Sequence, residues 1–274
     1  MYEYFAEQNP VPEWAVDLDW ETLGPLEFRS VGAYSETAFF HKPTDTLLVT
    51  DAVVSVTDQP PRIIEEDPRA MLFHARDSIE ERVEDTLETR AKGWRRMVQF
   101  GLVFFPSQIE VVPAGRALRE SRQSVDPSAR NLGEGAVPLS LYPWTWHEGD
   151  ADRKNFNAIS KGGKLFAPPI LTKLILDREP QRTLAWADRV AERFPFKRVI
   201  PCHLNNNVKA TPQEFREAFD CLRSTPGNII PQRPLAEDLA LLQKASDTLT
   251  RFGVVGPSQV CDGEPARAEG RFAS

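Results

Sequence analysis

Two metal-competent side chains each follow an apolar stretch of the sequence. Asp51 comes directly after "LLVT", and His203 comes directly after "RVIPC". Both stretches are short and rich in branched residues, as buried strands are. In an open α/β sheet, ligands collect beyond the carboxyl ends of the strands, so a carboxylate and an imidazole there could converge. Both groups are ligands that zinc accepts, although either residue alone is more often a cap or a satisfied polar group.

A catalytic zinc usually has three protein ligands and one open position. The chain has four histidines, and His74, in "MLFHARD", is the next candidate ligand, with His41 after it. No H-x-H or H-E-x-x-H pair occurs, so the familiar zinc motifs are absent. The strand-end pair alone does not define a catalytic metal site.

Other chemistries have less support. Cys202 and His203 are adjacent, but neighbouring side chains on a strand point to opposite faces. We therefore reject a thiol–imidazole dyad and expect Cys202 to be a buried structural residue. No G-x-S-x-G elbow is present for a serine nucleophile. The segment "SKGGKLF" matches neither the Walker nor the Rossmann spacing, and we expect it to be a turn at the end of a helix.

Composition restricts the class of protein. The 274 residues, 41% of them hydrophobic, suffice for one large domain or two small ones. A net charge of −7 argues against nucleic-acid binding. Three cysteines without a C-x-x-C pair indicate an intracellular, reducing compartment, and no apolar run approaches the roughly 20 residues of a membrane span. The start, "MYEYFAEQNPVPEW", has no signal- or transit-peptide character, so we expect a soluble cytoplasmic protein, or a plastid one if the native chain begins upstream.

The first half of the chain predicts strands, then a helix. Residues 25–56 are typical of a β-meander, ending in "TLLVTDAVVSV", whose near-continuous apolar run predicts a strand covered on both faces. Residues 86–105 repeat apolar side chains at three- and four-residue steps, which predicts a helix capped near Thr86. Residues 106–150 lack sustained periodicity, and we expect a long surface excursion there. For the tryptophans of its "YPWTWHEGD" we favour packing over the core, with a partner-contact surface as the alternative.

From residue 151 the pattern is mostly helical. A helix is predicted to begin near Pro180, and a short strand spans 197–202. The sequence "TPQE" at 211–214 is a capping box with proline at the first helical position. A last helix over about 234–252 is stopped by Gly253. Strands followed by helices around one more strand predict a mixed α/β fold.

Four blocks of the sequence resemble one known family. They are "EFRSVGAYSETAFFHKPTDTLLVTDAVV", "AKGWRRMVQFG", "KLFAPPILTKLILDREP" and "FKRVIPCHLNNNVKATPQEFREAFDCLR". Together they resemble domain of unknown function 4336, within the metallo-β-lactamase-like superfamily, over about residues 13–255. The resemblance implies an αββα sandwich with a metal site at one edge. It matches Asp51 to the aspartate that bridges two metals and His203 to the late histidine of the second metal site, with zinc or iron as the metal and a bound hydroxide as the nucleophile of a hydrolase.

The chain also departs from that pattern. It has no H-x-H-x-D-H motif, and we expect the N-terminal strands of the sandwich to be absent. We therefore expect one domain over 1–255, incomplete at its N-terminus and interrupted by the excursion 106–150, with a disordered tail over 256–274. A sheet edge left open by missing strands would favour a homo-oligomer or a partner chain.

The expected function follows from this incomplete match. It is a metallo-β-lactamase-like protein with a vestigial or incomplete metal site and no robust catalysis. One alternative is a metal-dependent hydrolase of a small ester, thioester or phosphoester, completed by upstream sequence or a partner chain. Another is a non-catalytic interaction module.

Overall fold

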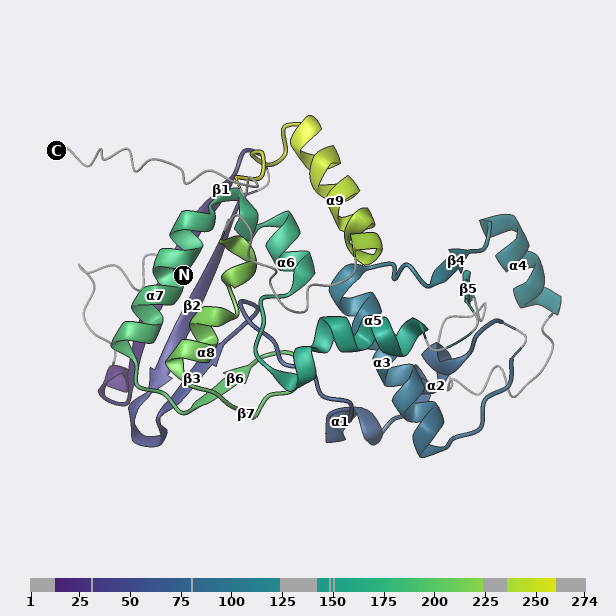
Figure 1. The fold of residues 1–274 in the computed structure, drawn as a ribbon, viewed down its shortest axis with the longest axis horizontal. Coiled ribbons are helices and arrows are strands. Elements are labelled where there is room, and N and C mark those ends of the chain that lie inside the picture. Colours follow the sequence, from purple (N-terminus) through teal and green to yellow (C-terminus); the bar gives the residue numbers. More distant parts are fainter. Residues whose placement is uncertain are drawn as a thin grey trace.

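The structure is a computed structural model that describes residues 13–30, 32–79, 81–123, 142–147, 149, 151–223 and 236–259. Its main sheet has five strands in the order β1-β2-β3-β6-β7 (Figure 1). The strands are β1 (Leu18–Phe28), β2 (Gly32–His41), β3 (Thr46–Val49), β6 (Arg198–Pro201) and β7 (Val208–Lys209). All neighbouring strands are antiparallel except β3 and β6, which run parallel with Leu47 opposite Val199. The carboxyl ends of β3 and β6 therefore meet at one edge of the sheet.

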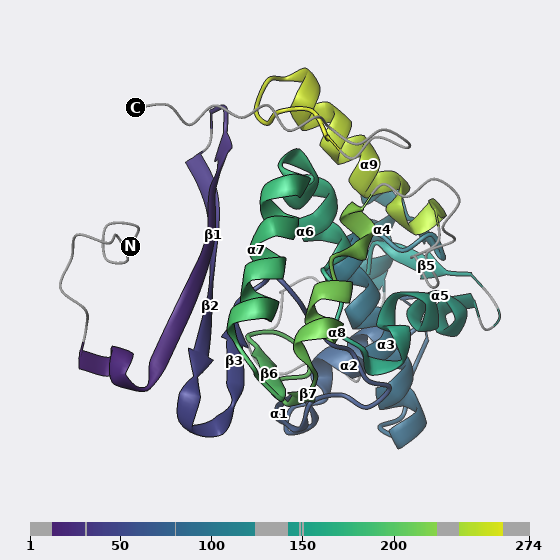
Figure 2. The same cartoon turned by 60° about the vertical axis from the view of Figure 1, so that its left-hand side comes forward.

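Helices cover one face of this sheet (Figure 2). They are α6 (Pro169–Leu174), α7 (Pro180–Arg193) and α8 (Pro212–Glu217). The predicted stripe of α7, which includes Leu184, Ala187 and Val190, is buried against the inward-facing side chains of the strands. The Trp186 indole N–H donates to Glu21 O of β1 at 3.1 Å. On the opposite face, the outward side chains line an apolar hollow of about 600 Å³ that includes Phe39 and Leu48.

A second group of helices packs beside the sheet. It comprises α1 (Arg62–Glu65), α2 (Arg69–Ala75), α3 (Leu87–Val103), α4 (Ala114–Gln123), α5 (Ala151–Ser160) and α9 (Ala236–Arg251). Thr86 caps α3 by accepting a hydrogen bond from Thr89 N at 3.1 Å, as the sequence predicts. Helices α2 and α3 cross closely at Gly93, where an added Cβ would lie 1.9 Å from Met71 O. The glycine is thus required by the crossing rather than by its backbone angles.

The later elements agree closely with expectation. Helix α7 begins at Pro180, and α8 begins after the capping box of Thr211 and Glu214. Gly253 follows the end of α9 with a φ of +70°. The "SKGGK" segment is a turn at the end of α5, with both glycines at positive φ. Short 3-10 turns complete the described chain at Glu13–Val16, Lys42–Thr44, Lys161–Gly163, Leu176–Arg178 and Asp220–Leu222.

Other expectations need correction. Residues 106–150 contain elements that the sequence did not predict: β4 (Ile109–Val111), α4 and β5 (Trp144–Trp146); residues 124–141 lie outside the described part. Strands of three residues are too short to produce a periodic pattern. The run "TLLVTDAVVSV" is a strand only at β3, and its second half is buried outside the main sheet, with Val54 bridged to Phe166. Continuous burial alone does not distinguish a strand from a buried extended segment.

At the C-terminus, the first residues of the predicted tail make contacts. Ser258 Oγ donates to Asp177 Oδ2 at 2.9 Å, and Gln259 N donates to Asp177 O at 2.8 Å. Residues 260–274 are not among those described.

The mixed α/β architecture is therefore confirmed. The only other sheet in the described ranges is the β4–β5 pair, so the αββα sandwich stays a prediction. In the described residues no helix combines the length and the apolar character needed to cross a membrane.

Candidate metal site

The two strand-end residues lie in direct contact. His203 Nε2 is 2.9 Å from Asp51 Oδ1, within hydrogen-bond distance. The contact follows from the parallel pairing of β3 and β6, which puts Val49 opposite Pro201 and is continued by Cys202 N donating to Thr50 O at 3.3 Å. Both side chains are open to solvent, at 50% exposed for Asp51 and 66% for His203. The two side chains thus converge as expected, and they form a small, solvent-accessible carboxylate–imidazole pair.

A buried carboxylate holds the Asp51 turn. Glu36, in the middle of β2, is only 1% exposed. Its Oε1 accepts from Thr50 N at 3.0 Å, while its Oε2 accepts from Thr50 Oγ1 at 2.6 Å, Asp51 N at 2.9 Å and Ala52 N at 3.1 Å. Three successive backbone N–H groups therefore point at one carboxylate. This arrangement fixes the chain direction at the residue that carries the Asp51 side chain.

Tyr34 completes the buried side of this cluster. Its hydroxyl donates to Glu36 Oε2 at 3.3 Å. Burial raises the pKa of Tyr34 well above its usual value, and the negative charges of Glu36 and Asp51 raise it further. Tyr34 therefore remains a neutral hydrogen-bond donor at neutral pH.

The loop after β6 holds His203 from the other side. Leu204 has a φ of +66°, which turns the chain immediately after the histidine. Asn205 N then donates to Ser55 O at 3.1 Å, and the Asn205 amide approaches Ser55 Oγ at 3.4 Å. The "NNN" sequence thus serves as a turn that anchors the loop to the segment following Asp51.

Cys202 differs from expectation because its side chain is exposed rather than buried. It occupies the outward position at the end of β6, where none of the helices α6, α7 and α8 covers the sheet. The argument that Cys202 and His203 point in different directions does not depend on burial, so this correction affects only the structural role assigned to the thiol.

His74 does not join the strand-end pair. It lies on α2 among aromatic rings, stacked on Trp144 with ring centroids 5.9 Å apart and at 5.2 Å from Phe100. Burial lowers the pKa of His74 to about 4, and the positive charges of Arg96 and Arg76 lower it further. The structure therefore places His74 as a neutral core side chain, and the prediction that it is a third ligand has no geometric support.

His41 is also remote from Asp51. It pairs with Thr46 at the start of β3, whereas Asp51 follows the end of that strand. Its Nδ1 lies 2.7 Å from Thr44 Oγ1.

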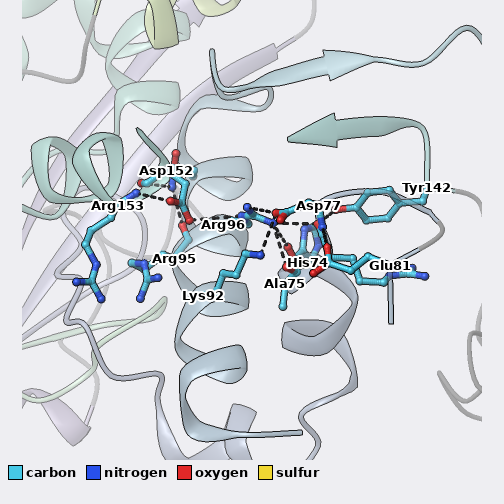
Figure 3. Close-up of polar contacts among 12 residues, drawn as sticks. His74, Ala75, Asp77, Glu81, Lys92, Arg95, Arg96, Tyr142, Asp152 and Arg153 are labelled. Carbon is cyan, nitrogen blue, oxygen red and sulfur yellow. Dashed lines mark hydrogen bonds and ion pairs between the residues drawn. The ribbon is translucent and has the colours of Figure 1, made fainter. Parts of the chain in front are cut away.

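The aromatic cluster around His74 borders a buried arginine, Arg96, whose polar contacts are drawn in Figure 3. Arg96 Nη1 donates to Ala75 O at 3.0 Å and Arg76 O at 2.9 Å, at the carboxyl end of α2. Its Nη2 donates to Asp77 Oδ1 at 2.5 Å, and its Nε lies 3.4 Å from Asp152 Oδ2 of α5. Burial would raise the pKa of Asp77, but hydrogen bonds from Lys92 and Arg96 outweigh it and lower that pKa. This network joins α2, α3 and α5 and has a structural role.

The tryptophans of "PWTW" belong to the same cluster. Trp146 is 3% exposed and lies under the Arg96 guanidinium, whose Cζ is 4.2 Å from the ring centroid. Trp144 contacts Phe73 and Phe100. The packing interpretation is confirmed for Trp146, and Trp144 lies half-buried among the same rings.

Sequence reasoning missed Glu36 and Arg96. Glu36 interrupts an apolar register, because it falls between Tyr34 and Ala38 on the inward face of β2. A charged residue where the strand alternation predicts burial is the signal that could have found it. Arg96 lies two residues from both Trp94 and Val98, on the side of α3 away from their stripe, so the helical pattern gives no such signal for it.

The described residues contain no group of three or more His, Cys, Asp or Glu side chains that could hold a metal ion. The Asp51–His203 pair offers two donors. A catalytic zinc needs three protein ligands, and a dinuclear centre needs more. The residues described here therefore do not fit a complete catalytic metal centre, and we derive no hydrolytic step from them.

Comparison with known proteins places the chain in a family. The family model described as "Domain of unknown function (DUF4336)" matches residues 3–221. The chain belongs to the DUF4336 family. The matched region of this DUF4336 chain includes all five strands of the main sheet, and with them Glu36, Asp51 and His203. No curated protein and no solved structure matches the chain.

Proposed function

We propose that this DUF4336 chain is a metallo-β-lactamase-like protein with an incomplete metal site. In this proposal Asp51 and His203 bind one divalent ion, such as zinc or ferrous iron, and the chain by itself has no robust catalytic activity. The observation that carries the proposal is the 2.9 Å contact between the two side chains at the carboxyl ends of adjacent parallel strands. That edge is where open α/β sheets place their ligands.

The chemistry of the pair suits a transition-metal ion. A carboxylate oxygen and a neutral imidazole nitrogen each bind zinc at about 2.0–2.2 Å. Two such donors on one tetrahedral ion lie roughly 3.3 Å apart, so the pair needs to open only slightly to admit an ion. Both side chains are at least half exposed, and an ion could enter without rearrangement of the core.

Two protein ligands also set a limit on affinity. The remaining coordination positions would be filled by water, and water ligands add no chelate stabilisation. We therefore expect weak, rapidly exchanging binding rather than a resident metal. The same argument separates this site from a catalytic centre.

Isothermal titration calorimetry of metal-free full-length chain with zinc tests the proposal. We expect saturable one-to-one binding in the parent that is lost in both Asp51→Ala and His203→Ala. His41→Ala is the matched control, because His41 is also a strand-end histidine but lies at the other end of the sheet. Absence of binding in the parent, or equal binding in all variants, would contradict the proposal.

A second candidate is a hydrolase whose metal ligands are completed by another chain. The open position of the pair favours it, because an edge where both ligands are solvent-exposed leaves room for donors from a partner. Hydrolysis of small ester, thioester or phosphoester substrates with added zinc would test this candidate. Activity that rises more steeply than protein concentration and disappears in His203→Ala would support it over the non-catalytic proposal.

A further inference from the structure

We propose that Glu36 is a positioning residue that holds Asp51 against His203. This inference deepens the proposed function and rests on it for its consequence, the affinity for the divalent ion. The claim that Glu36 maintains the Asp51–His203 contact can be tested without any metal.

The structure surrounds the Glu36 carboxylate with hydrogen-bond donors rather than with a cation. Five donated hydrogen bonds reach its two oxygens, three from backbone N–H groups and two from hydroxyls. Its 1% exposure leaves almost no contact with water. A buried carboxylate is unfavourable unless such donors compensate for the lost hydration. Satisfying this charge therefore requires the turn at residues 50–52 to keep its observed conformation.

The positions of these hydrogen bonds explain why Glu36 constrains Asp51 in particular. The backbone N–H groups belong to Thr50, Asp51 and Ala52, so the carboxylate fixes the peptide planes on both sides of the Asp51 Cα. With those planes fixed, the Asp51 side chain can leave the turn in only a few staggered directions. One of them is the direction that places Oδ1 at 2.9 Å from His203 Nε2.

The alternative is that Glu36 only stabilises the fold. Loss of a merely structural carboxylate would lower the melting temperature without moving the His203 ring environment or the zinc affinity of the folded protein. Loss of a positioning residue instead changes both the His203 ring environment and the zinc affinity while the protein stays folded. Orientation of ligands by their hydrogen-bonding neighbours typically changes metal affinity by about 10–100-fold.

The test compares the parent full-length chain with Glu36→Gln. Glutamine keeps the length of the side chain but replaces one acceptor oxygen by an NH2 donor, which faces N–H groups it cannot accept from. Glu21→Gln is the matched control, since Glu21 is a half-buried carboxylate of the same sheet that pairs with Arg189 and Arg193 instead. The readouts are amide hydrogen exchange at residues 50–52, the NMR signals of the His203 ring, and zinc titration.

We expect faster exchange at Thr50, Asp51 and Ala52 in Glu36→Gln. We also expect the His203 ring signals to move in the same direction as in Asp51→Ala, and the zinc affinity to fall at least tenfold. Glu21→Gln should leave all three readouts as in the parent. Unchanged His203 ring signals in folded Glu36→Gln would overturn the inference. If the parent binds zinc, an unchanged zinc affinity in Glu36→Gln would also overturn it.

If the parent binds no zinc, the proposed function fails, and the His203 ring signals and amide exchange alone decide whether Glu36 positions Asp51. If Glu36→Gln does not fold, Thr50→Val takes its place. That variant removes a single hydrogen bond to the carboxylate, from Thr50 Oγ1. A smaller shift of the His203 signals in the same direction would support the inference, and no shift would overturn it.

Discussion

Asp51 Oδ1 and His203 Nε2 lie 2.9 Å apart, although the two residues are far apart in the sequence. The contact exists because β3 and β6 are parallel neighbours, with their carboxyl ends at the same edge. Glu36 supports one partner through the turn after β3, and the Asn205–Ser55 contacts support the other. The Asp51–His203 pair is thus supported from both strands that carry it.

Removing the charge of Asp51 should weaken metal binding while preserving the shape of the site. For Asp51→Asn we expect zinc affinity to fall on the order of tenfold or more, because the anionic ligand becomes a neutral amide. Calorimetric titration at constant pH measures the change. Asp45→Asn is the control, since Asp45 precedes the same strand and pairs with Lys197 at 2.7 Å. An equal loss in both variants would show that general negative charge, not this pair, attracts the ion.

Arg96 should be the most sensitive charged residue for stability. Arg96→Met removes the donors to the end of α2, the hydrogen bond to Asp77 and the ion pair with the buried Asp152. We expect a loss of about 3 kcal/mol in the free energy of unfolding, as for other broken buried ion pairs. Urea denaturation measures it, with the exposed Arg153→Met as control. A change under about 1 kcal/mol would contradict the assigned role.

His74 should make the protein less stable as the pH falls. Its pKa is lowered to about 4 in the folded state, against an ordinary value of 6.5, so the unfolded chain binds the proton more readily. The contribution of the neutral His74 side chain to the free energy of unfolding is therefore complete above pH 6.5 and is lost as the pH falls toward 4. Between pH 7 and pH 5 this amounts to about 2 kcal/mol. Urea denaturation at both pH values should show a smaller difference for His74→Phe than for the parent, and an unchanged difference would argue against burial of a neutral imidazole.

Two glycines of α3 should respond in opposite ways to alanine. An alanine Cβ at Gly93 would clash with Met71 O of α2, whereas nothing lies within 4 Å of a Cβ at Gly101. Gly93→Ala should cost about 3 kcal/mol by forcing the two helices apart. Gly101→Ala should stabilise the protein by about 0.5–1 kcal/mol, since alanine is the better helix former. Thermal unfolding of the two variants measures the contrast, and similar melting temperatures would mean that α2 and α3 do not cross at Gly93.

Local signals in the sequence predicted much of the secondary structure. The Thr211 capping box, the proline that begins α7 and the glycine after α9 each depend on hydrogen bonds or backbone angles within a few residues. The three-residue strands β4 and β5 were missed because they are shorter than any periodic pattern. The helix predicted over residues 86–105 ends earlier, at Val103, and Phe105 is 44% exposed.

The sequence by itself determined that Asp51 and His203 each follow an apolar strand, because the side chains of neighbouring residues determine where a strand forms and where it ends. Only the tertiary structure decided that these strands pair in parallel, that Glu36 turns its carboxylate toward the Asp51 amides, and that His74 lies in an aromatic core instead. Those outcomes depend on which contacts between residues far apart in the sequence give the lowest free energy. The residues next to Glu36 or His74 in the sequence do not show which distant partners those contacts involve.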